Sequence, residues 1–348
     1  MKAGIFAYTR HGAALALKIK QVLTVYGFEA QVFTLAKFLT GGMPALDLGP
    51  NPAAVYQTAF QEDRLLVFIG ATGIAIRSIA PYVKSKAEDP AVLSLDEQGT
   101  FVIPLLSGHI GGANALALKI AQELKATPVL TTATDVNKLF AVDEWAARHN
   151  MAISSLSSAK TFAAYLVDGQ AVGVCSDFPV REPLPKGLQL ACEGPVGVAI
   201  SLHKGVQPFV DTLVLRPRIL HLGIGCRKGT TMDAIEKLVL EQLRRLNLTL
   251  SLVTGIASID VKKDEPGLLA FAREYALPFH CYTAAQLQQV EGTFTPSAFV
   301  AKTVGVDNVC ERAAVLDSRG GRLLLKKTSQ EGVTLALACE NLTVDFNQ

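Results

Sequence analysis

The alternation of buried strands, small-residue loops and amphipathic helices constrains this chain more than any other feature. Residues 2–8 (KAGIFAY) predict a buried strand, residues 12–26 carry apolar side chains at helical spacing up to Gly27, and EAQVFTL predicts the next strand. A strand, a helix and a strand in this order form a βαβ unit, which requires a parallel sheet. Repeats of the unit predict a doubly wound α/β fold.

The same alternation continues to about residue 150 and then changes. Further strands are predicted at LLVFI, at AVLSLD and TFVIPLL around the turn EQG, and at PVLTT. Residues 177–195 carry four prolines among several charges, and an Arg-Pro-Arg triplet at 216–218 precedes the buried strand RILHLGIG. We therefore predict an α/β chain in three parts. These are a doubly wound, mostly parallel sheet as N-terminal domain (residues 1–137), a small middle α/β domain (138–216) and an α/β C-terminal domain (217–348).

Composition narrows the class of protein. Hydrophobic residues make up 49% of the chain and charged residues 18%, which favours large cores over disorder. We expect no membrane helix and no signal peptide, because apolar runs are short and the N-terminus reads MKAGIFAYTRHG. A net charge of +2 without a basic stripe predicts no nucleic-acid partner. Six scattered cysteines without a CxxC pair indicate neither a disulfide framework nor a zinc ribbon, so we expect a cytoplasmic protein. A homodimer is compatible with the sequence.

Three loops join a strand to a helix, and ligands bind at that edge of open α/β sheets. Helix N-termini there offer unpaired N–H groups and partial positive charge, which suit carboxylates and phosphates. The first loop is Gly70-Ala71-Thr72-Gly73, with Arg77 one turn into the following helix. Arg77 could pair with a ligand carboxylate, and a tight turn with a solvated arginine is the equally weighted alternative.

The second loop, from Ser107 to Asn114, gathers a hydroxyl, an imidazole and an amide within eight residues. Its three glycines are Gly108, Gly111 and Gly112. His109 titrates near neutrality, and its position between glycines in a predicted loop favours an acid–base role over packing. Ser107 is a weaker candidate nucleophile, because members of a triad meet in space rather than in sequence. A helix N-cap role for Ser107 or Asn114 is at least as good an interpretation.

The third loop is GIGCRKGT, from Gly223 to Thr230. Its third glycine comes four residues after Gly225, and no acidic residue follows at the expected spacing, so we exclude a dinucleotide fingerprint. Arg227 and Lys228 beside a helix N-terminus still predict an anion site. Thr230 and Asp233 have capping-box spacing. Cys226 lies in a setting that lowers a thiol pKa, although a small buried cysteine is the favoured interpretation.

Two groups of acidic residues complete the candidates. Asp135 and Asp143 flank the loop ATDVNKLF, and carboxylates at strand ends can act as general bases. Asp264 and Glu265 precede Pro266, and we interpret them as the start of a helix rather than as a site.

Together, these segments resemble one family. FIGATGIAIRSIAP, DPAVLSLDEQGTFVIPLLSGHIGGAN, PVLTTATDVN, HLGIGCRKGTT and IASIDVKKDEPGLLAFA are similar, in order, to the successive motifs of the CbiG family. Members of that family are cobalt-precorrin-5A hydrolases of the anaerobic route to cobalamin. The resemblance covers about residues 1 to 340.

The resemblance implies a reaction. The enzyme would open the δ-lactone of cobalt-precorrin-5A with water, release acetaldehyde and yield cobalt-precorrin-5B. The substrate carries the cobalt, so we expect no cofactor and no protein metal site. Its many acetate and propionate groups would explain loops that offer N–H groups, Arg77, Arg227 and Lys228 to a single ligand.

Chemistry alone supplies the expected catalytic residues. His109, with Asp135 or Glu97, would activate water against the lactone carbonyl, and N–H groups around Gly108 to Gly112 would stabilise the oxyanion. The expected substrate-binding residues are Gly70, Thr72, Gly73, Arg77, Ser107, Gly108, Gly111, Gly112, Asn114, Gly225, Cys226, Arg227, Lys228 and Thr230.

Three other functions are weaker. A non-catalytic corrinoid carrier would bind without turnover. A methyltransferase of the same pathway would need a glycine-rich loop with a ribose-binding acid, which we do not find. An NAD-dependent enzyme fails on the glycine spacing of the third loop.

Overall fold

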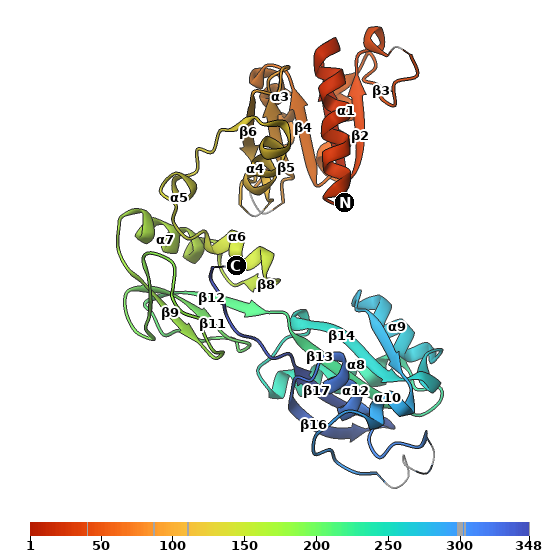
Figure 1. Cartoon of the computed structure of the whole chain (residues 1–348). Helices are drawn as coiled ribbons and strands as arrows, with labels where there is room; N and C mark the ends of the chain where they lie inside the picture. The colour runs from red at the N-terminus through yellow and green to blue at the C-terminus, as the bar shows by residue number, and fades with distance from the viewer. Residues whose placement is uncertain (40, 86–87, 110, 298–301, 303, 348) are drawn as a thin grey trace. The chain divides into compact units, whose positions relative to one another are not determined.

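The computed structural model describes residues 1–39, 41–85, 88–109, 111–297, 302 and 304–347. The chain divides into two compact units, Met1–Glu144 and Trp145–Gln348 (Figure 1). Three sheets follow one another along the chain, the first in unit 1 and the other two in unit 2. Their mostly parallel strands confirm the predicted α/β class.

The sheet of unit 1 has the order β3-β2-β1-β4-β5-β6-β7. Its strands are β1 (Lys2–Ala7), β2 (Glu29–Thr34), β3 (Leu46–Asp47), β4 (Leu65–Ile69), β5 (Ala91–Leu95), β6 (Phe101–Leu106) and β7 (Thr127–Pro128). Strands β1 to β5 run parallel to one another, β6 is antiparallel to β5, and β7 is parallel to β6. The strand predicted at PVLTT (residues 128–132) is largely wrong, since only its first residue, Pro128, lies in β7.

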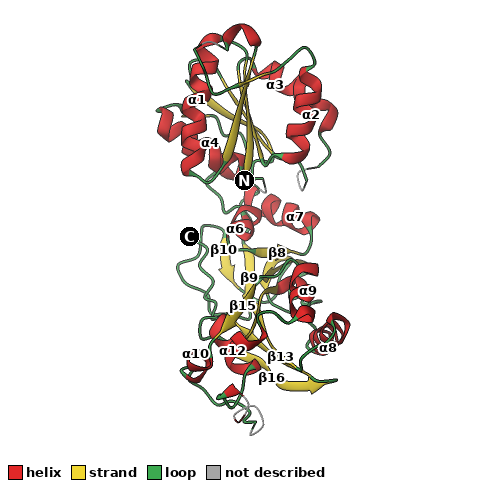
Figure 2. Ribbon diagram, turned by 90° about the vertical axis from the view of Figure 1, so that its right-hand side faces the viewer, coloured by secondary structure: helices red, strands yellow, loops and turns green. Residues whose placement is uncertain are grey.

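Helices cover both faces of this sheet, as Figure 2 shows. They are α1 (Arg10–Val25), α2 (Pro52–Glu62), α3 (Thr72–Ile79) and α4 (Ala113–Leu124). Two further helices, α5 (Ala133–Val136) and α6 (Val142–Arg148), follow β7, and α6 crosses the boundary between the units. One core packs α1 and α4 against the sheet through side chains such as Ile19 and Ile120, and the other packs α2 and α3 through Phe60 and Ala75. Burial on both faces explains the continuous apolar strands of the sequence.

The middle sheet has the order β10-β9-β11-β12-β8. Its strands are β8 (Met151–Ile153), β9 (Val172–Ser176), β10 (Leu188–Leu190), β11 (Val196–Ile200) and β12 (Asp211–Pro217), and helix α7 (Leu156–Val167) packs against them. A disulfide joins Cys175 to Cys192, which corrects the expectation from the cysteine spacing. The parallel pairing of β9 with β10 brings the two cysteines together, and no short motif records that pairing.

The C-terminal sheet has the order β15-β14-β13-β17-β16. Its strands are β13 (Leu220–Cys226), β14 (Val253–Ile259), β15 (Phe279–Tyr282), β16 (Arg322–Gln330) and β17 (Val333–Cys339), with helices α8 (Met232–Arg245), α9 (Pro266–Glu274), α10 (Ala284–Gln288) and α12 (Cys310–Asp317). The closing hairpin of β16 and β17 is confirmed. Helix α12 lies close against the sheet because Gly223 has no side chain: a Cβ there would lie 1.8 Å from the carbonyl oxygen of Cys310.

Short 3-10 turns lie at Ala36–Phe38, Ala80–Tyr82, Leu250–Leu252 and Asp260–Lys262. Within the described parts of the chain, no helix has the length and apolar character needed to cross a membrane.

Candidate active site

The loop after β6 forms a compact turn that depends on its glycines. A Cβ on Gly111 would lie 2.5 Å from Cβ of Ser107, and Gly112 has a φ of +82°, which favours glycine. Gly112 is the N-cap of α4, so the capping interpretation of Ser107 and Asn114 is wrong. Ser107 is buried, and its hydroxyl donates to the carbonyl of Asp89 (2.9 Å). Ile110, in the same loop, lies outside the described residues.

His109 lies between two carboxylates. Its Nε2 is 3.1 Å from Oδ2 of Asp135 on α5, and its Nδ1 is 3.3 Å from Oδ1 of Asp143 on α6. The buried Asn114 donates to the same Asp135 oxygen (2.7 Å) and to the Thr132 hydroxyl (3.1 Å). The side chains of His109 and Asp135 are 13% and 18% exposed, so the cluster remains open to solvent. The structure therefore brings His109, Asp135 and Asn114 into one site.

The two carboxylates determine the charge of the imidazole. The hydrogen bond to Asp143 is the largest cause that raises the pKa of His109 to about 9, with a further contribution from Asp135, while burial opposes the shift. The ring is therefore protonated at neutral pH, and both ring nitrogens donate. A protonated imidazole cannot take a proton from water, so the expected role of His109 as the base that activates water is corrected to that of a proton donor.

The same cluster is close enough to hold a metal ion. Ligand atoms of His109, Asp135 and Glu144 all lie within 4.8 Å of one another. Carboxylate and imidazole ligands suit divalent cations. A metal at this position would have to displace the proton that the two aspartates hold on His109.

Gly70–Gly73 and Glu97 lie at the other edge of the sheet from His109. The hairpin turn joins β5 to β6 beyond Leu95 and Val102, and the amide of Gly70 donates to the Leu95 carbonyl (2.8 Å). His109 follows the opposite end of the six-residue strand β6, about 20 Å away at roughly 3.3 Å per residue. Glu97 therefore does not assist His109, and the first two loops do not form one site. Glu97 was expected to assist His109, and the first two loops were expected to share one ligand. Both expectations are wrong, because the hairpin of β5 and β6 reverses the chain direction and carries His109 to the other end of the strands.

The first loop instead lies where the strand order changes between β1 and β4, which is where ligands bind in such sheets. Gly70 packs against the ring of Tyr8: a Cβ on Gly70 would lie 3.3 Å from Cδ2 of the tyrosine. The exposed Arg77 folds back over Gly73, with Nη1 3.3 Å from the equivalent Cβ position. Thr72 begins α3. These residues form a second, separate candidate anion site of unit 1.

The third loop lines a pocket of about 690 Å³ at the carboxyl end of β13. Its charged lining residues are Arg227, Lys228, Lys262, Lys327 and Glu331. The carboxylate of Glu265 accepts hydrogen bonds from the amide of Gly229 (2.5 Å) and from Nζ of Lys262 (3.1 Å), which hold the loop in place. Helix α9 begins at Pro266, as the preceding acids predict. Four cations against one carboxylate suit a polyanionic ligand.

At this loop the structure favours the expected interpretation of Cys226 over the alternative of a nucleophile, and it corrects the expected helix cap. Burial raises the pKa of Cys226, and nearby Lys262 only partly opposes the shift, so the residue is a thiol and a poor nucleophile. The N-cap of α8 is Thr231, whose hydroxyl accepts from the amide of Ala234 (3.3 Å). The hydroxyl of Thr230 donates instead to the carbonyl of Arg227 (2.8 Å).

A polar cluster that no local motif predicts lies toward the amino end of β13 in the C-terminal sheet. Asp317, at the end of α12, binds Nδ1 of His221 (2.6 Å), Nδ1 of His280 (2.7 Å) and the hydroxyl of Tyr282 (2.8 Å). Nε2 of His221 contacts Glu340 (2.8 Å). Burial alone would raise the pKa of Asp317, but these hydrogen bonds outweigh it and lower the pKa. The members are spread over 120 positions, and only the pair His280 and Tyr282, on one face of a strand, gave a local signal.

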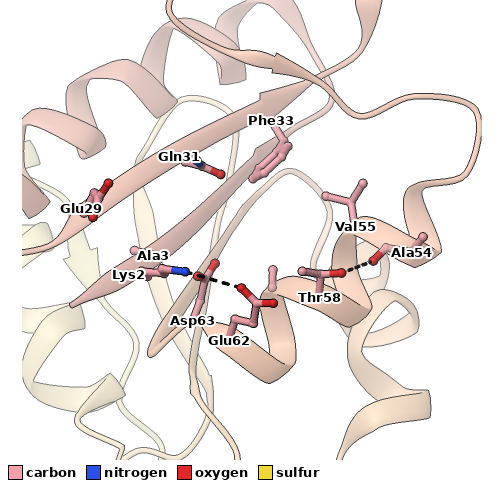
Figure 3. Close-up of a pocket in the computed structure, with 11 residues that line it drawn as sticks. Lys2, Ala3, Glu29, Gln31, Phe33, Ala54, Val55, Thr58, Glu62 and Asp63 are labelled. Atoms are coloured by element: carbon pink, nitrogen blue, oxygen red, sulfur yellow. Dashed lines mark hydrogen bonds and ion pairs between the residues drawn. The ribbon is translucent and has the colours of Figure 1, made fainter.

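A further pocket lies between the amino ends of β1 and β2 and helix α2 (Figure 3). Its volume is about 390 Å³, and Lys2 and Glu62 form an exposed ion pair across it (3.5 Å). Burial raises the pKa of Asp63 on its wall. Three acids and one lysine line this pocket, which makes it unsuited to a polycarboxylate.

Family models match successive parts of the chain. They are described as cobalamin synthesis G N-terminal (residues 54–135), cobalamin biosynthesis central region (140–217) and cobalamin synthesis G C-terminus (220–338). A cobalt-precorrin-5A hydrolase of Salmonella typhimurium is 38% identical over 345 residues, which cover 96% of each chain. The chain belongs to the CbiG family. Its site residues His109 and Asp135 lie inside the N-terminal match.

Other CbiG relatives cover the chain just as fully. A cobalt-precorrin-5A hydrolase of Priestia megaterium is 31% identical over 355 residues, covering 96% of this chain and 94% of that protein. A crystal structure of a cobalamin biosynthesis protein G homologue from Sulfolobus solfataricus is 21% identical and covers 97% of both chains, with a TM-score of 0.42.

Proposed function

We propose that this protein is a cobalt-precorrin-5A hydrolase of cobalamin biosynthesis. It opens the δ-lactone of its substrate with water, releases acetaldehyde and yields cobalt-precorrin-5B. Relatives with that name, similar over nearly the whole chain, support the proposal. The structural observation that carries it is a protonated histidine between two aspartates at a solvent-accessible loop.

Asp135 is the base that activates water. Its Oδ2 accepts from both His109 and Asn114, and these bonds fix the orientation of the carboxylate. Among the residues with described positions, Oδ1 of Asp135 makes no hydrogen bond, so it is available to a water molecule. A carboxylate positioned in this way accepts a proton as the water attacks the lactone carbonyl.

His109 is the matching acid. As the bond between the acyl carbon and the ring oxygen breaks, the imidazolium protonates the departing ring oxygen, and the lactone becomes a hydroxyl and a carboxylic acid that ionises into the solvent. The neutral imidazole then takes the hydroxyl proton, the adjacent carbon–carbon bond breaks, and acetaldehyde leaves. The bonding electron pair stays with the macrocycle, which takes up a proton. Asp143 keeps Nδ1 of His109 in place through both steps.

Fewer N–H groups of the second loop are available to an oxyanion in the structure than the sequence suggests. The amides of Gly112 and Ala113 donate to carbonyls within the loop, and so does the amide of Asn114. Of the described residues in this loop, Gly108, His109 and Gly111 have N–H groups without such a bond, and we assign those of Gly108 and His109 to the oxyanion.

The basic side chains of the third loop and its surroundings suit the carboxylate groups of such a substrate. The pocket of about 690 Å³ presents Arg227, Lys228 and Lys262, and charge-assisted hydrogen bonds to carboxylates are the strong ones. Gly225, Cys226 and Thr230 shape the approach to these groups. We propose no resident cofactor, because the substrate carries the cobalt.

An anaerobic assay tests the proposal. The purified protein is incubated with cobalt-precorrin-5A, and acetaldehyde is measured. We expect the unaltered protein to release acetaldehyde. The rate for His109→Ala should be lower by about 100-fold or more, which is the usual scale of acid–base catalysis. His203→Ala, which removes an exposed histidine of the middle region, is the matched control with an unchanged rate. Corrinoid binding without acetaldehyde would overturn the proposal in favour of a carrier.

A further inference from the structure

His280 combines features that the other five histidines of the chain lack. Its side chain is 52% exposed, and its Nδ1 lies 2.7 Å from Oδ1 of the buried Asp317. Because a carboxylate can only accept, Nδ1 carries the proton and the lone pair of the neutral ring is on Nε2. In contrast, His109 and His221 each use both ring nitrogens for carboxylates.

The acceptor of His280 is held rigidly. Oδ1 of Asp317 also accepts from the hydroxyl of Tyr282 (2.8 Å), and Oδ2 accepts from His221 (2.6 Å). The hydrogen bonds to Asp317 keep it ionised, since they lower its pKa despite burial. Water can satisfy the hydrogen-bonding groups of an exposed imidazole. We therefore assign this network to the orientation of the ring rather than to its solvation.

A buried carboxylate behind an exposed imidazole is the arrangement that orients metal-ligating histidines. The carboxylate fixes the tautomer and the ring direction and makes the opposite nitrogen a better ligand. We propose that His280 is an axial ligand to the cobalt of the bound corrinoid. The inference rests on the proposed function, because the cobalt belongs to the substrate.

Two structural features favour access by a large ligand. Strand β15 is at the edge of its sheet, where none of the described strands pairs with its outer side. A pocket of about 840 Å³ begins at Tyr282, the neighbour that shares the Asp317 oxygen, and includes Gln286, Gln289 and Phe294 in its lining. This volume falls within the usual range of small-molecule sites.

The ligand exchange requires no redox partner. Nε2 donates its lone pair to cobalt, an axial water leaves, and the Nδ1 proton stays in the hydrogen bond to Asp317. Imidazole nitrogen is a common ligand for transition metals of this kind.

Electron paramagnetic resonance tests the inference with cobalt(II) cobinamide, a corrinoid without an appended base. With excess full-length protein we expect a three-line splitting from one bound ¹⁴N nucleus. His280→Ala should lose the splitting, and added imidazole should restore it. His203→Ala, the matched exposed histidine, should keep the splitting. A spectrum without splitting in the unaltered protein, or splitting that survives in His280→Ala, overturns the inference.

Acetaldehyde release, measured in parallel, separates this inference from the proposed function. Turnover without nitrogen splitting refutes the cobalt ligand and leaves the hydrolase standing. Splitting without turnover supports the cobalt ligand and refutes the hydrolase.

Discussion

The two histidine–aspartate clusters of this protein are built in opposite ways. In unit 1 a histidine, His109, lies between the carboxylates of Asp135 and Asp143. In unit 2 a carboxylate, Asp317, lies between the imidazoles of His221 and His280. The central group of the first cluster is a cation that can release a proton, whereas that of the second is an anion that fixes its neighbours.

Burial separates the clusters further. The side chains of Asp135 and Asp317 are 18% and 2% exposed. A partly exposed charge is still solvated when a partner is lost, but a buried one is not. The difference teaches that similar residue types place an exchangeable proton at the centre of one cluster and a fixed acceptor at the centre of the other, and the following predictions test that distinction.

The largest expected effects come from one substitution made in both clusters. Asp135→Asn should lower the rate of acetaldehyde release by about 100-fold or more, because it removes the base. Asp317→Asn should instead lower the free energy of unfolding by about 3 kcal/mol or more, the usual cost of breaking a buried ion pair. Turnover assays and urea unfolding of both variants measure the two effects. Equal losses of stability in the two variants would contradict the difference in structural role between Asp135 and Asp317.

The charge of His109 predicts the pH dependence of both activity and stability. Its pKa of about 9 in the folded protein lies above the ordinary value of 6.5. Its stabilising effect is therefore fully present below pH 6.5 and is lost as the pH rises through about 9, at a cost of up to about 3 kcal/mol. The rate of acetaldehyde release should fall over the same pH range and give an alkaline limb in the pH–rate profile, because the neutral ring cannot act as the acid.

Asp143→Asn serves as the control for this limb. The hydrogen bond to Asp143 is the largest cause of the raised pKa, so its removal should move the midpoint of the alkaline limb to lower pH. The pH profile of kcat/KM for both proteins measures the shift. An unchanged midpoint would show that another group controls the limb.

Local patterns in the sequence were enough to predict the fold class and part of the first site. The buried strand FVIPLL and the glycines after it led to His109, and the following segment led to Asp135. The role of His109 was not predictable, because its charge depends on Asp143, which meets it only in the folded chain. The position of Glu97 was misjudged because the direction of β6 follows from pairing, which helical and strand periodicity do not report.

The second cluster was beyond such reasoning for a physical reason. Its members come from three strands or strand ends and one helix end, and none has a functional neighbour in sequence apart from His280 and Tyr282. Gly255 permits the contact, since a Cβ there would lie 2.7 Å from Oδ2 of Asp317. A glycine inside a buried strand signals a close approach, but it does not identify the approaching group.

The smallest expected effect distinguishes the two histidines that bind Asp317. His221 is 9% exposed and has carboxylates at both ring nitrogens, with a pKa that these hydrogen bonds raise although burial opposes them. His221→Gln should therefore lower the free energy of unfolding by about 2 kcal/mol or more, since it leaves Asp317 and Glu340 without the shared cation. His280 is half exposed, and Asp317 keeps two donors without it, so His280→Gln should cost less than about 1 kcal/mol. Urea unfolding at pH 7 measures both. If the His280 variant were as unstable as the His221 variant, its imidazole would belong to the architecture of the sheet edge, and its exposed nitrogen would need no ligand to explain it.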